Sequence, residues 1–312
     1  WFIFGSTTRA SPCLPSTLDI IVQPGNGYGG DSLLVQPVLR ALDTSGRTCV
    51  TDNTSTVYVE VKKNPAVYAS VNAYNMTGSA RGKPFDPPRP YAEVTMVQGV
   101  ATFSGLYITM LGTGFSLNFV SLSLGKQIES DTFNIMLGSV YAVLFDQPPG
   151  TARGGESFVP QPRLRITDRG FNTVITDSST AFTVTMVGRP SGQVKNGTLS
   201  STIGANGFSA RATNGVATFI GLSIDVAGFP YALRFTADHS AFLTNGQPNF
   251  IEQVKMTVGV GKAVSINLIQ EPASVVAGEG FNESTRPTLE LLDAGGNRLV
   301  EDVTSKVSAS IF

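Results

Sequence analysis

The acidic residues of this chain recur in pairs that could bind a cation or shape a turn. The pairs are Asp43 and Asp52, Asp168 and Asp177, and Asp293 and Asp302. Oxygen ligands gathered in loops suit calcium, so a calcium site at domain junctions is one interpretation. Acidic clusters are sparse here, however, and we favour turn residues whose carboxylates accept hydrogen bonds from backbone amides. Apart from this calcium alternative, we expect no cofactor.

Residue types that support catalysis are scarce. The single histidine, His239, lies in Ala237-Asp238-His239-Ser240 near the end of an expected strand. A Ser-His-Asp triad would use such a histidine, but an exposed loop histidine is the favoured interpretation. The sequence has no Cys/His cluster with zinc-ligand spacing and no glycine-rich phosphate loop before a helix. We therefore expect no enzyme, and no catalytic, cofactor-binding or metal-binding residue.

The two cysteines, Cys13 and Cys49, lie next to two expected strands. Cys13 precedes the strand from Leu18 to Val22, and Cys49 follows the strand from Val35 to Leu42. If these strands pair antiparallel, the two sulfurs meet, and a bridge closing such a loop adds about 3–4 kcal/mol in the chain-entropy model. We predict this disulfide; the alternative is two small buried or free thiols.

Asparagine-linked glycans are the other chemistry that the sequence allows. Four Asn-x-Ser/Thr sequons occur in or beside expected loops, at Asn53, Asn75, Asn196 and Asn282. None has proline in the middle, and a loop position lets a sugar project from the surface. A chain rich in serine and threonine also produces a few sequons by chance, so both interpretations stay open.

Composition excludes several partners. The chain has 312 residues, a charged fraction of 14% and a net charge of −1. Binding to nucleic acid or to an anionic membrane requires a concentrated patch of basic residues. The sequence has no such concentration, so we expect neither partner. No run of 18 apolar residues is present to span a bilayer. A weakly charged surface suits an extracellular protein kept soluble by glycans, or one that self-associates.

A long internal repeat organises the sequence. The pattern Pro-x-Leu-x-x-x-Asp begins at Pro37, Pro162 and Pro287, with steps of 162 − 37 = 125 and 287 − 162 = 125 residues. A period of this length exceeds that of solenoid repeats and matches whole domains. The chain is therefore predicted to be a tandem array of similar domains.

The elements of each repeat are predicted to be strands. Alternation of apolar and polar residues marks the segments 57–61, 182–186 and 307–311, and glycine- and proline-rich turns separate the runs. No window of a dozen residues shows a helical apolar stripe. About seven strands per repeat, at this spacing, predict an all-β chain of β-sandwich domains.

A second motif marks the later half of each repeat and carries a family resemblance. Gly99-Val-Ala-Thr-Phe-Ser-Gly-Leu106 returns as Gly215-Val-Ala-Thr-Phe-Ile-Gly-Leu222. Together with the Pro-x-Leu-x-x-x-Asp strand, it resembles the immunoglobulin-like repeats of invasin-type and related cell-surface adhesion proteins. The resemblance implies tandem immunoglobulin-like sandwiches in an extracellular stalk or fibre, and it brings no catalytic residues.

Domain boundaries follow from the repeat. We expect a closing strand of a preceding unit with a linker (1–16), a first domain (17–138), a second domain (139–263) and the first strands of a third (264–312). The first domain carries about nine more residues in its middle loop, because Val61 to Gly99 spans 38 residues and Met186 to Gly215 spans 29. Loops accept such insertions at small entropic cost and often carry recognition.

These features predict a structural segment of an extracellular filament, appendage or cell-surface stalk that assembles head to tail with copies of itself. The apolar segment Trp1, Phe2, Ile3 and Phe4 is predicted to be an assembly strand that completes the partial third domain, in the same array or in another copy. The alternative is a surface adhesin whose loop 74–91, with Tyr74, Phe85 and Tyr91 as contacts, binds a receptor or glycan.

Overall fold

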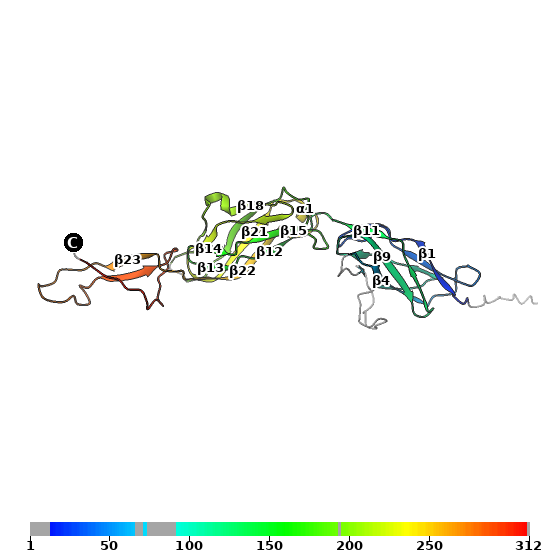
Figure 1. Ribbon diagram of the computed structural model, residues 1–312, viewed down its shortest axis with the longest axis horizontal. Coiled ribbons are helices and arrows are strands. Elements are labelled where there is room, and N and C mark those ends of the chain that lie inside the picture. Colours follow the sequence, from blue (N-terminus) through cyan, green and yellow to red (C-terminus); the bar gives the residue numbers. More distant parts are fainter. Residues whose placement is uncertain (1–12, 66–70, 74–91, 193–194, 311–312) are drawn as a thin grey trace, which may run out of the picture. The chain divides into compact units, whose positions relative to one another are not determined.

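The computed structural model describes residues 13–65, 71–73, 92–192 and 195–310 (Figure 1). By internal contacts the chain divides into two compact units. Unit 1 comprises residues 1–140 and 167–174, and unit 2 comprises residues 141–166 and 175–312. The boundaries expected from the sequence, near 138 and 263, stay predictions. No helix among the described residues is long and apolar enough to cross a membrane.

Unit 1 is built from strands alone in its described part. They are β1 (Thr17–Val22), β2 (Gly27–Tyr28), β3 (Val38–Leu42), β4 (Thr56–Lys63), β5 (Val71–Ala73), β6 (Ala92–Thr95), β7 (Val100–Thr102), β8 (Leu106–Ile108), β9 (Gly112–Ser121), β10 (Lys126–Glu129) and β11 (Phe133–Met136). One sheet has the order β1-β3-β7, a second has the order β2-β11-β9-β4-β6 with β10 also on β9, and β5 pairs with β8. Short strands such as β2 and β10 raise the number above the seven expected.

The core of unit 1 comes from the inward-facing residues of both main sheets. Val57 and Val59 on β4, like Phe115 and Phe119 on β9, are fully buried, as the alternating sequence predicts. Phe103, just after β7, packs against Phe119 with 5.4 Å between ring centroids. The two sheets therefore share one apolar core, which is the arrangement of a β-sandwich.

Unit 2 repeats this plan. Its strands are β12 (Ala142–Gln147), β13 (Thr151–Arg153), β14 (Glu156–Val159), β15 (Arg163–Thr167), β16 (Ala181–Gly188), β17 (Leu199–Ser201), β18 (Ser209–Arg211), β19 (Val216–Thr218), β20 (Leu222–Ile224), β21 (Gly228–Ala237) and β22 (Phe250–Gly259). A 3-10 helix, η1 (Gly204–Phe208), and one short helix, α1 (Ala241–Thr244), are added. The sheets have the orders β12-β15-β19 and β17-β20-β14-β13-β22-β21-β16-β18.

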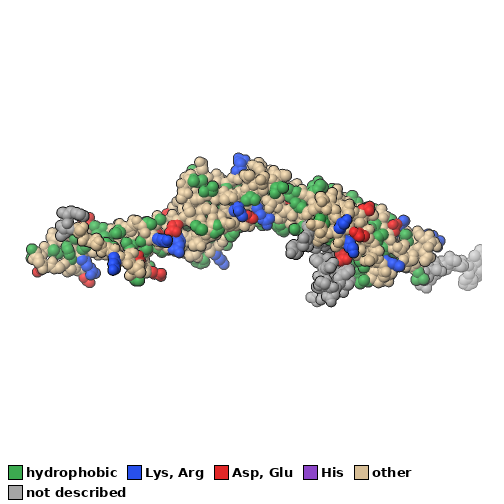
Figure 2. Space-filling view, viewed as in Figure 1, with side chains coloured by type: hydrophobic (Ala, Val, Ile, Leu, Met, Phe, Trp, Pro, Cys, Tyr) green, Lys and Arg blue, Asp and Glu red, His purple; other side chains and the backbone are tan. Residues whose placement is uncertain are grey.

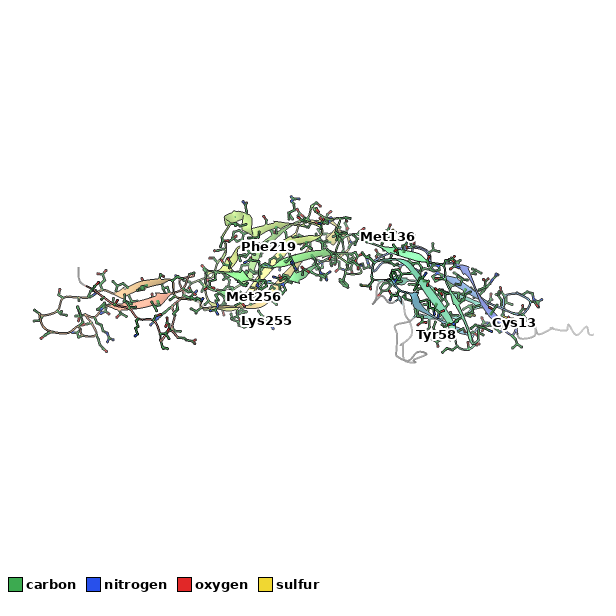
Figure 3. All side chains as sticks on the ribbon, in the orientation of Figure 1. Cys13, Tyr58, Met136, Phe219, Lys255 and Met256 are labelled. Carbon is green, nitrogen blue, oxygen red and sulfur yellow. A yellow bond between two sulfur atoms is a disulfide. The ribbon has the colours of Figure 1, made fainter. Side chains whose placement is uncertain are left out.

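The core of unit 2 centres on aromatic side chains. Phe219, labelled in Figure 3, packs edge to face on Phe235 with 5.2 Å between centroids, and Phe145 does the same on Phe235 at 5.5 Å. Phe219 and Phe235 occupy the positions of Phe103 and Phe119 in unit 1: the first of each pair ends the shared Gly-Val-Ala-Thr-Phe motif, and the second lies on the long strand that follows. The all-β fold of tandem immunoglobulin-like sandwiches is thus confirmed.

The hairpins that carry the second motif are the same in both units. Gln98 and Gly99 have φ values of 51° and 75°, and Asn214 and Gly215 have the same two values. Positive φ at both central residues is the geometry of the tightest hairpin turns, for which glycine at the second position is favoured. The Gly99 and Gly215 amides donate to the carbonyls of Asp52 and Asp177, each at 2.7 Å.

The start of a third repeat is a two-stranded hairpin counted within unit 2. Strands β23 (Ser265–Gln270) and β24 (Thr288–Leu292) pair antiparallel, as β1 pairs with β3. Strands β12 and β15 are neighbours in the corresponding sheet of the second repeat. The strand expected at 307–311 is wrong for residues 307–310, which form no strand. The corresponding strands β4 and β16 pair with β9 and β21, and the described residues offer no such partner here.

Candidate connector sites

The turn that follows β15 is held by several buried or partly buried hydrogen bonds. Asp168, which is 0% exposed, begins it. Its Oδ1 accepts hydrogen bonds from the Asn172 amide at 2.9 Å and the Asn172 Nδ2 at 3.0 Å. Its Oδ2 accepts from the amide of Gly138 at 3.1 Å. One buried carboxylate therefore ties its own turn to the linker at Gly138.

Two more hydrogen bonds seat this turn among the loops of unit 1. Asn172 Nδ2 also donates to the carbonyl of Thr109 at 2.6 Å. The amide of Gly170 donates to the carbonyl of Gly29 at 2.9 Å. The loops of unit 1 thus bind the turn through the backbone amide of Gly170 and the side-chain amide of Asn172.

Glycines line the contact because no side chain has room there. A Cβ on Gly29 would lie 3.1 Å from the Thr109 carbonyl oxygen, and one on Gly30 would lie 2.7 Å from the Arg169 oxygen. A Cβ on Gly170 would lie 2.8 Å from the carbonyl carbon of Gly29. Gly30 also has a φ of +77°, which favours glycine. We call Gly29 and Gly30 the socket and residues 168–172 the seated turn.

An ion pair flanks the socket. Arg169 Nε lies 3.0 Å from Asp31 Oδ1, with both side chains close to half exposed. Exposed pairs of this kind contribute little to stability, typically below about 1 kcal/mol. Recognition of the turn therefore depends on the buried bonds of Asp168 and Asn172.

Unit 2 contains a second seated turn in which the aspartate and the asparagine make the equivalent bonds. Asp293, 2% exposed, accepts from the amides of Asn297 at 2.8 Å and Gly261 at 2.7 Å. Asn297 Nδ2 donates to the carbonyl of Asp225 at 2.7 Å. A Cβ on Gly155 would lie 2.7 Å from the Ala294 oxygen, so Gly154 and Gly155 form the socket of this turn.

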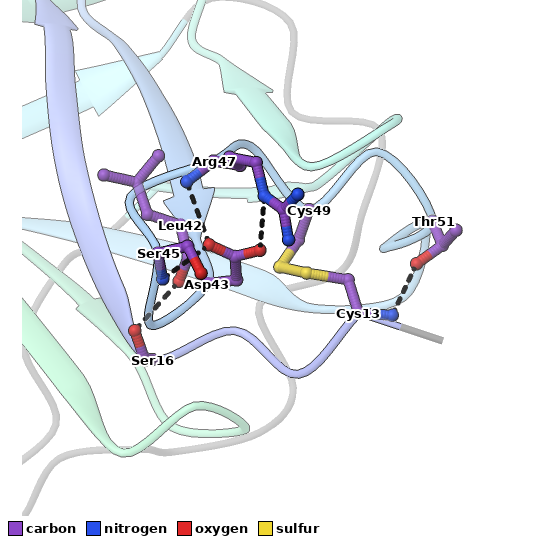
Figure 4. Close-up of a disulfide and its surroundings, with 8 residues drawn as sticks. All are labelled: Cys13, Ser16, Leu42, Asp43, Ser45, Arg47, Cys49 and Thr51. Carbon is purple, nitrogen blue, oxygen red and sulfur yellow. Dashed lines mark hydrogen bonds and ion pairs between the residues drawn. A yellow bond between two sulfur atoms is a disulfide. The ribbon is translucent and has the colours of Figure 1, made fainter. Parts of the chain in front are cut away.

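The equivalent turn of the first repeat, residues 43–47, meets no glycine socket among the described residues, and we call it the unseated turn. Asp43 Oδ1 accepts from the amides of Ser45 at 2.8 Å and Arg47 at 2.9 Å. These bonds, that of Arg47 foremost, hold the pKa of Asp43 below its usual range. The Arg47 side chain is 79% exposed, and a Cβ on Gly46 would meet nothing within 4 Å. Figure 4 shows this turn beside the disulfide of Cys13 and Cys49, whose Cα atoms are 5.3 Å apart.

The second aspartate of each pair caps a serine- and threonine-rich turn. Asp177 Oδ1 accepts from the amides of Ser179 at 2.8 Å and Thr180 at 3.0 Å, and Oδ2 accepts from the Thr180 hydroxyl at 2.5 Å. Burial alone would raise the pKa of Asp177, but these hydrogen bonds outweigh it and the pKa lies below its usual value. Asp302 makes the equivalent bonds with Thr304 and Ser305. The interpretation of the aspartates as turn residues is confirmed.

Other sites expected from the sequence are spread over the surface. Asn53, Asn196 and Asn282 are exposed, and no glycan is part of the structure. The assembly strand Trp1, Phe2, Ile3 and Phe4, the contact loop with Tyr74, Phe85 and Tyr91, and the sequon at Asn75 lie outside the described residues. In the view of Figure 2, acidic and basic side chains are interspersed over the described surface.

The histidine makes local structural contacts, and the carboxylates form no metal-binding group among the described residues. His239 Nδ1 accepts from the amide of Ala241 at 3.1 Å, and its ring packs edge to face on Phe242. Within the described part of the chain, no group of three or more His, Cys, Asp or Glu side chains is placed to hold a metal ion. The described residues therefore provide no set of ligands for the calcium site that was the alternative role of the aspartate pairs.

Several residues of the connector sites were missed by sequence reasoning. Asn172 and Asn297 stand 125 residues apart, as do the sockets Gly29-Gly30 and Gly154-Gly155. A further repeated feature is the glutamine before the motif proline: Gln161 Nε2 donates to the Leu222 carbonyl at 3.0 Å while its Oε1 accepts from the Leu222 amide at 3.0 Å. Gln36 does the same with Leu106. The 125-residue step would have found all of them.

No protein-family model and no curated protein match this sequence. Among solved structures, the chain is similar to the Escherichia coli adhesin FdeC, with 16% identity, 92% of this chain and 76% of that chain covered, and a TM-score of 0.29. It is similar to a glycosyl hydrolase family 2 member from Bacteroides cellulosilyticus DSM 14838 (11%, 77% and 28%, 0.28). It is also similar to invasin, a bacterial integrin-binding protein (11%, 91% and 48%, 0.28).

The chain thus spans about half of the invasin chain and about a quarter of the hydrolase. The similar structures include both adhesins and a hydrolase. At TM-scores below 0.3, these similarities do not indicate what the present chain binds or does. Its function has to be argued from its own connector sites.

Proposed function

We propose that the chain is a structural segment of an extracellular filament, appendage or surface stalk in which sandwich repeats follow one another head to tail. The observation that carries this proposal is the recurrence of one connection: the turn of Asp168 and Asn172, and the turn of Asp293 and Asn297, are seated by equivalent hydrogen bonds. A connection that is the same at each step lets repeats be added without new contacts.

Chemistry at the surface supports an extracellular location. The disulfide of Cys13 and Cys49 suits an oxidising compartment. The sequon asparagines Asn53, Asn196 and Asn282 are exposed, as acceptors of glycans must be. The proposed partners are copies of the same chain, and the proposal includes no catalytic role and no cofactor.

Strand addition between copies belongs to the same proposal. In the first two repeats, β7 pairs with the free edge of β3 and β19 pairs with the free edge of β15. No described strand pairs with the corresponding edge of β24. Open edges accept extended segments. We propose that a strand such as Trp1 to Phe4 of another copy, or of the same array, completes this sheet.

Electron microscopy of the purified full chain tests the proposal. Regular fibres that grow with protein concentration are expected, and a chain lacking residues 1–5 is expected to form none if that segment supplies the strand. Fibres of unchanged yield from the shortened chain would remove strand addition and keep the array. Particles that stay single at all concentrations would contradict assembly between copies.

The alternative proposal is a surface adhesin that presents loop 74–91. It is supported by the nine-residue excess of this loop over its counterpart in the second repeat. Capture of glycans or receptor-bearing cells by single particles, abolished by shortening this loop to the length found in the second repeat, would favour the adhesin. Retained capture by the shortened chain would exclude the loop as the contact.

A further inference from the structure

The residues around the unseated turn differ from their counterparts in a consistent way. Cys13 precedes Asp43 by 43 − 13 = 30 residues, and Gly138 precedes Asp168 by 168 − 138 = 30 residues. Cys49 corresponds to Val174, because 174 − 49 = 125. The linker position whose amide binds the aspartate in the seated turn is therefore a disulfide-bonded cysteine in the first repeat.

The turn of the first repeat does not have the shape that a glycine socket accepts. Its third residue is Ser45, where the seated turns have Gly170 and Gly295. A Cβ on Gly170 would lie 2.8 Å from the Gly29 carbonyl carbon, and one on Gly295 would lie 2.7 Å from the Asp225 carbonyl carbon. Contacts this short with backbone require something to shift, so Ser45 excludes the turn from such a socket.

The fifth residue of the turn differs in its hydrogen bonding. Asn172 and Asn297 each donate from one Nδ2 both to the turn aspartate and to a carbonyl of the socket loops. Arg47 occupies this position in the first repeat, and its guanidinium pairs with Asp43 at 3.3 Å with most of the side chain exposed. A long exposed guanidinium does not reproduce the short, partly buried amide bridge.

The linker of the first repeat is held in another way. The amide of Cys13 donates to the Thr51 hydroxyl oxygen at 3.0 Å, and the Cys13 sulfur is bonded to Cys49. The amide of Ser16 continues onto the carbonyl of Leu42 at 2.7 Å. Cys49 itself is fully buried in the core of unit 1. The bridge thus anchors the segment before β1 directly to that core.

We infer that the chain contains two kinds of connector, and that residues three and five of the aspartate turn decide between them. Glycine and asparagine, as in 168–172 and 293–297, specify a turn that seats in a Gly-Gly socket of another repeat. Serine and arginine, as in 43–47, specify a turn that does not seat, and the Cys13–Cys49 disulfide replaces the seat in holding the linker. This inference holds whether or not copies of the chain form fibres.

Hydrogen exchange of the full chain, read by mass spectrometry, tests the inference. Reductant is expected to raise exchange at least about tenfold in residues 13–16 and 43–49 and to leave 138 and 168–172 unchanged. The variant Asn172→Arg is expected to do the reverse, raising exchange at Gly138 and Gly170 by a similar factor. Asn297→Arg should act in the same way on Gly261 and 293–297.

The controls keep each outcome decisive. Asn206→Arg, which changes an exposed asparagine of η1, should alter none of these segments. Asn172→Ser is the milder variant if Asn172→Arg does not fold. Protection of 13–16 that survives full reduction would overturn the role of the disulfide. Protection of Gly138 and Gly170 that survives the loss of Asn172 would overturn the role of the asparagine.

Discussion

The turn of residues 43–47 and the turn of residues 168–172 are closed by the same backbone hydrogen bonds but differ in their surroundings. In both, the aspartate carboxylate accepts the amide four residues later, at 2.9 Å. Asp168 is fully buried, and a Cβ on Gly29 or Gly138 would meet its side chain, whereas a Cβ on Gly46 would meet nothing within 4 Å. The comparison separates what the sequence of a turn does by itself from what its surroundings add.

The surroundings change the energetic role of the same residue type. A buried carboxylate that accepts several amide hydrogen bonds leaves those donors unsatisfied when it is removed, and each such donor costs free energy. Asp43 is only partly exposed, but its amide donors Ser45 and Arg47 belong to exposed residues, so water can satisfy them when the carboxylate is removed. The two turns should therefore respond very differently to equivalent substitutions.

The largest effect is expected at the disulfide beside the unseated turn. Replacing Cys13 and Cys49 by alanine should lower the free energy of unfolding of unit 1 by about 3–4 kcal/mol, because the bridge closes a loop with a sequence separation of 36. Calorimetry of the variant and of the reduced parent should show the same fall in the unit 1 transition. A change below about 1 kcal/mol would mean that the linker contributes little to this unit.

The seated turn should show the next largest effect. Asp168→Ala should lower the free energy of unfolding of unit 1 by about 3 kcal/mol, because the amides of Gly138 and Asn172 and the Asn172 side chain lose a buried acceptor. The matched variant Asp43→Ala should lose far less. Urea unfolding of both variants gives the comparison, and equal losses would contradict the distinction between seated and unseated turns.

Much of this architecture could be predicted from the sequence, and the reason is periodicity. The 125-residue step and the alternation around Val57 and Phe182 predicted the strands β4 and β16, which the structure confirms. The pairing of β1 with β3 brought Cys13 near Cys49 as the strand order required. Local pattern is sufficient where burial on one face decides the conformation.

The sockets could not be predicted in the same way, because they depend on close approach between segments far apart in the sequence. Nothing local to Gly29 and Gly30 indicates that Asn172 will lie against them. The strand expected at 307–311 failed for a related reason: alternation predicts a strand only when a partner strand completes the ladder. The 125-residue spacing could have identified the residues that recur, although we did not single them out, whereas their contacts required coordinates.

The second aspartates extend the comparison to pH. Hydrogen bonds from Thr180 and Ser179 outweigh burial and lower the pKa of Asp177. A depressed folded pKa stabilises the fold above the unfolded value of about 3.9, and this contribution is lost as the pH falls through the folded pKa. Asp177→Asn should cost about 2 kcal/mol at neutral pH, and the difference from the parent should shrink below pH 4.

Urea unfolding at pH 7 and pH 3 measures this difference. Asp302 makes the same hydrogen bonds from a less buried position than Asp177, so Asp302→Asn is the matched variant and should have the smaller effect at neutral pH. A gap between Asp177→Asn and the parent that stays constant over this range would show that the carboxylate charge is not what stabilises the turn.

The smallest effect sharpens the comparison at a single backbone angle. Phe171 has a φ of 65° and is 55% exposed, while the equivalent Gly46 and Gly296 both have φ values of 78°. The left-handed region costs an ordinary L-residue about 1–2 kcal/mol, and asparagine tolerates it better. Phe171→Asn should therefore stabilise unit 1 by up to about 1 kcal/mol, the gain being reduced by lost contacts of the ring.

Gly46→Ala, where a Cβ meets nothing within 4 Å, isolates the backbone term and should cost about 1 kcal/mol. Thermal unfolding of the two variants decides the point: a loss at Phe171→Asn together with no cost at Gly46→Ala would mean that the ring contacts, and not the backbone angle, govern this position of the turn.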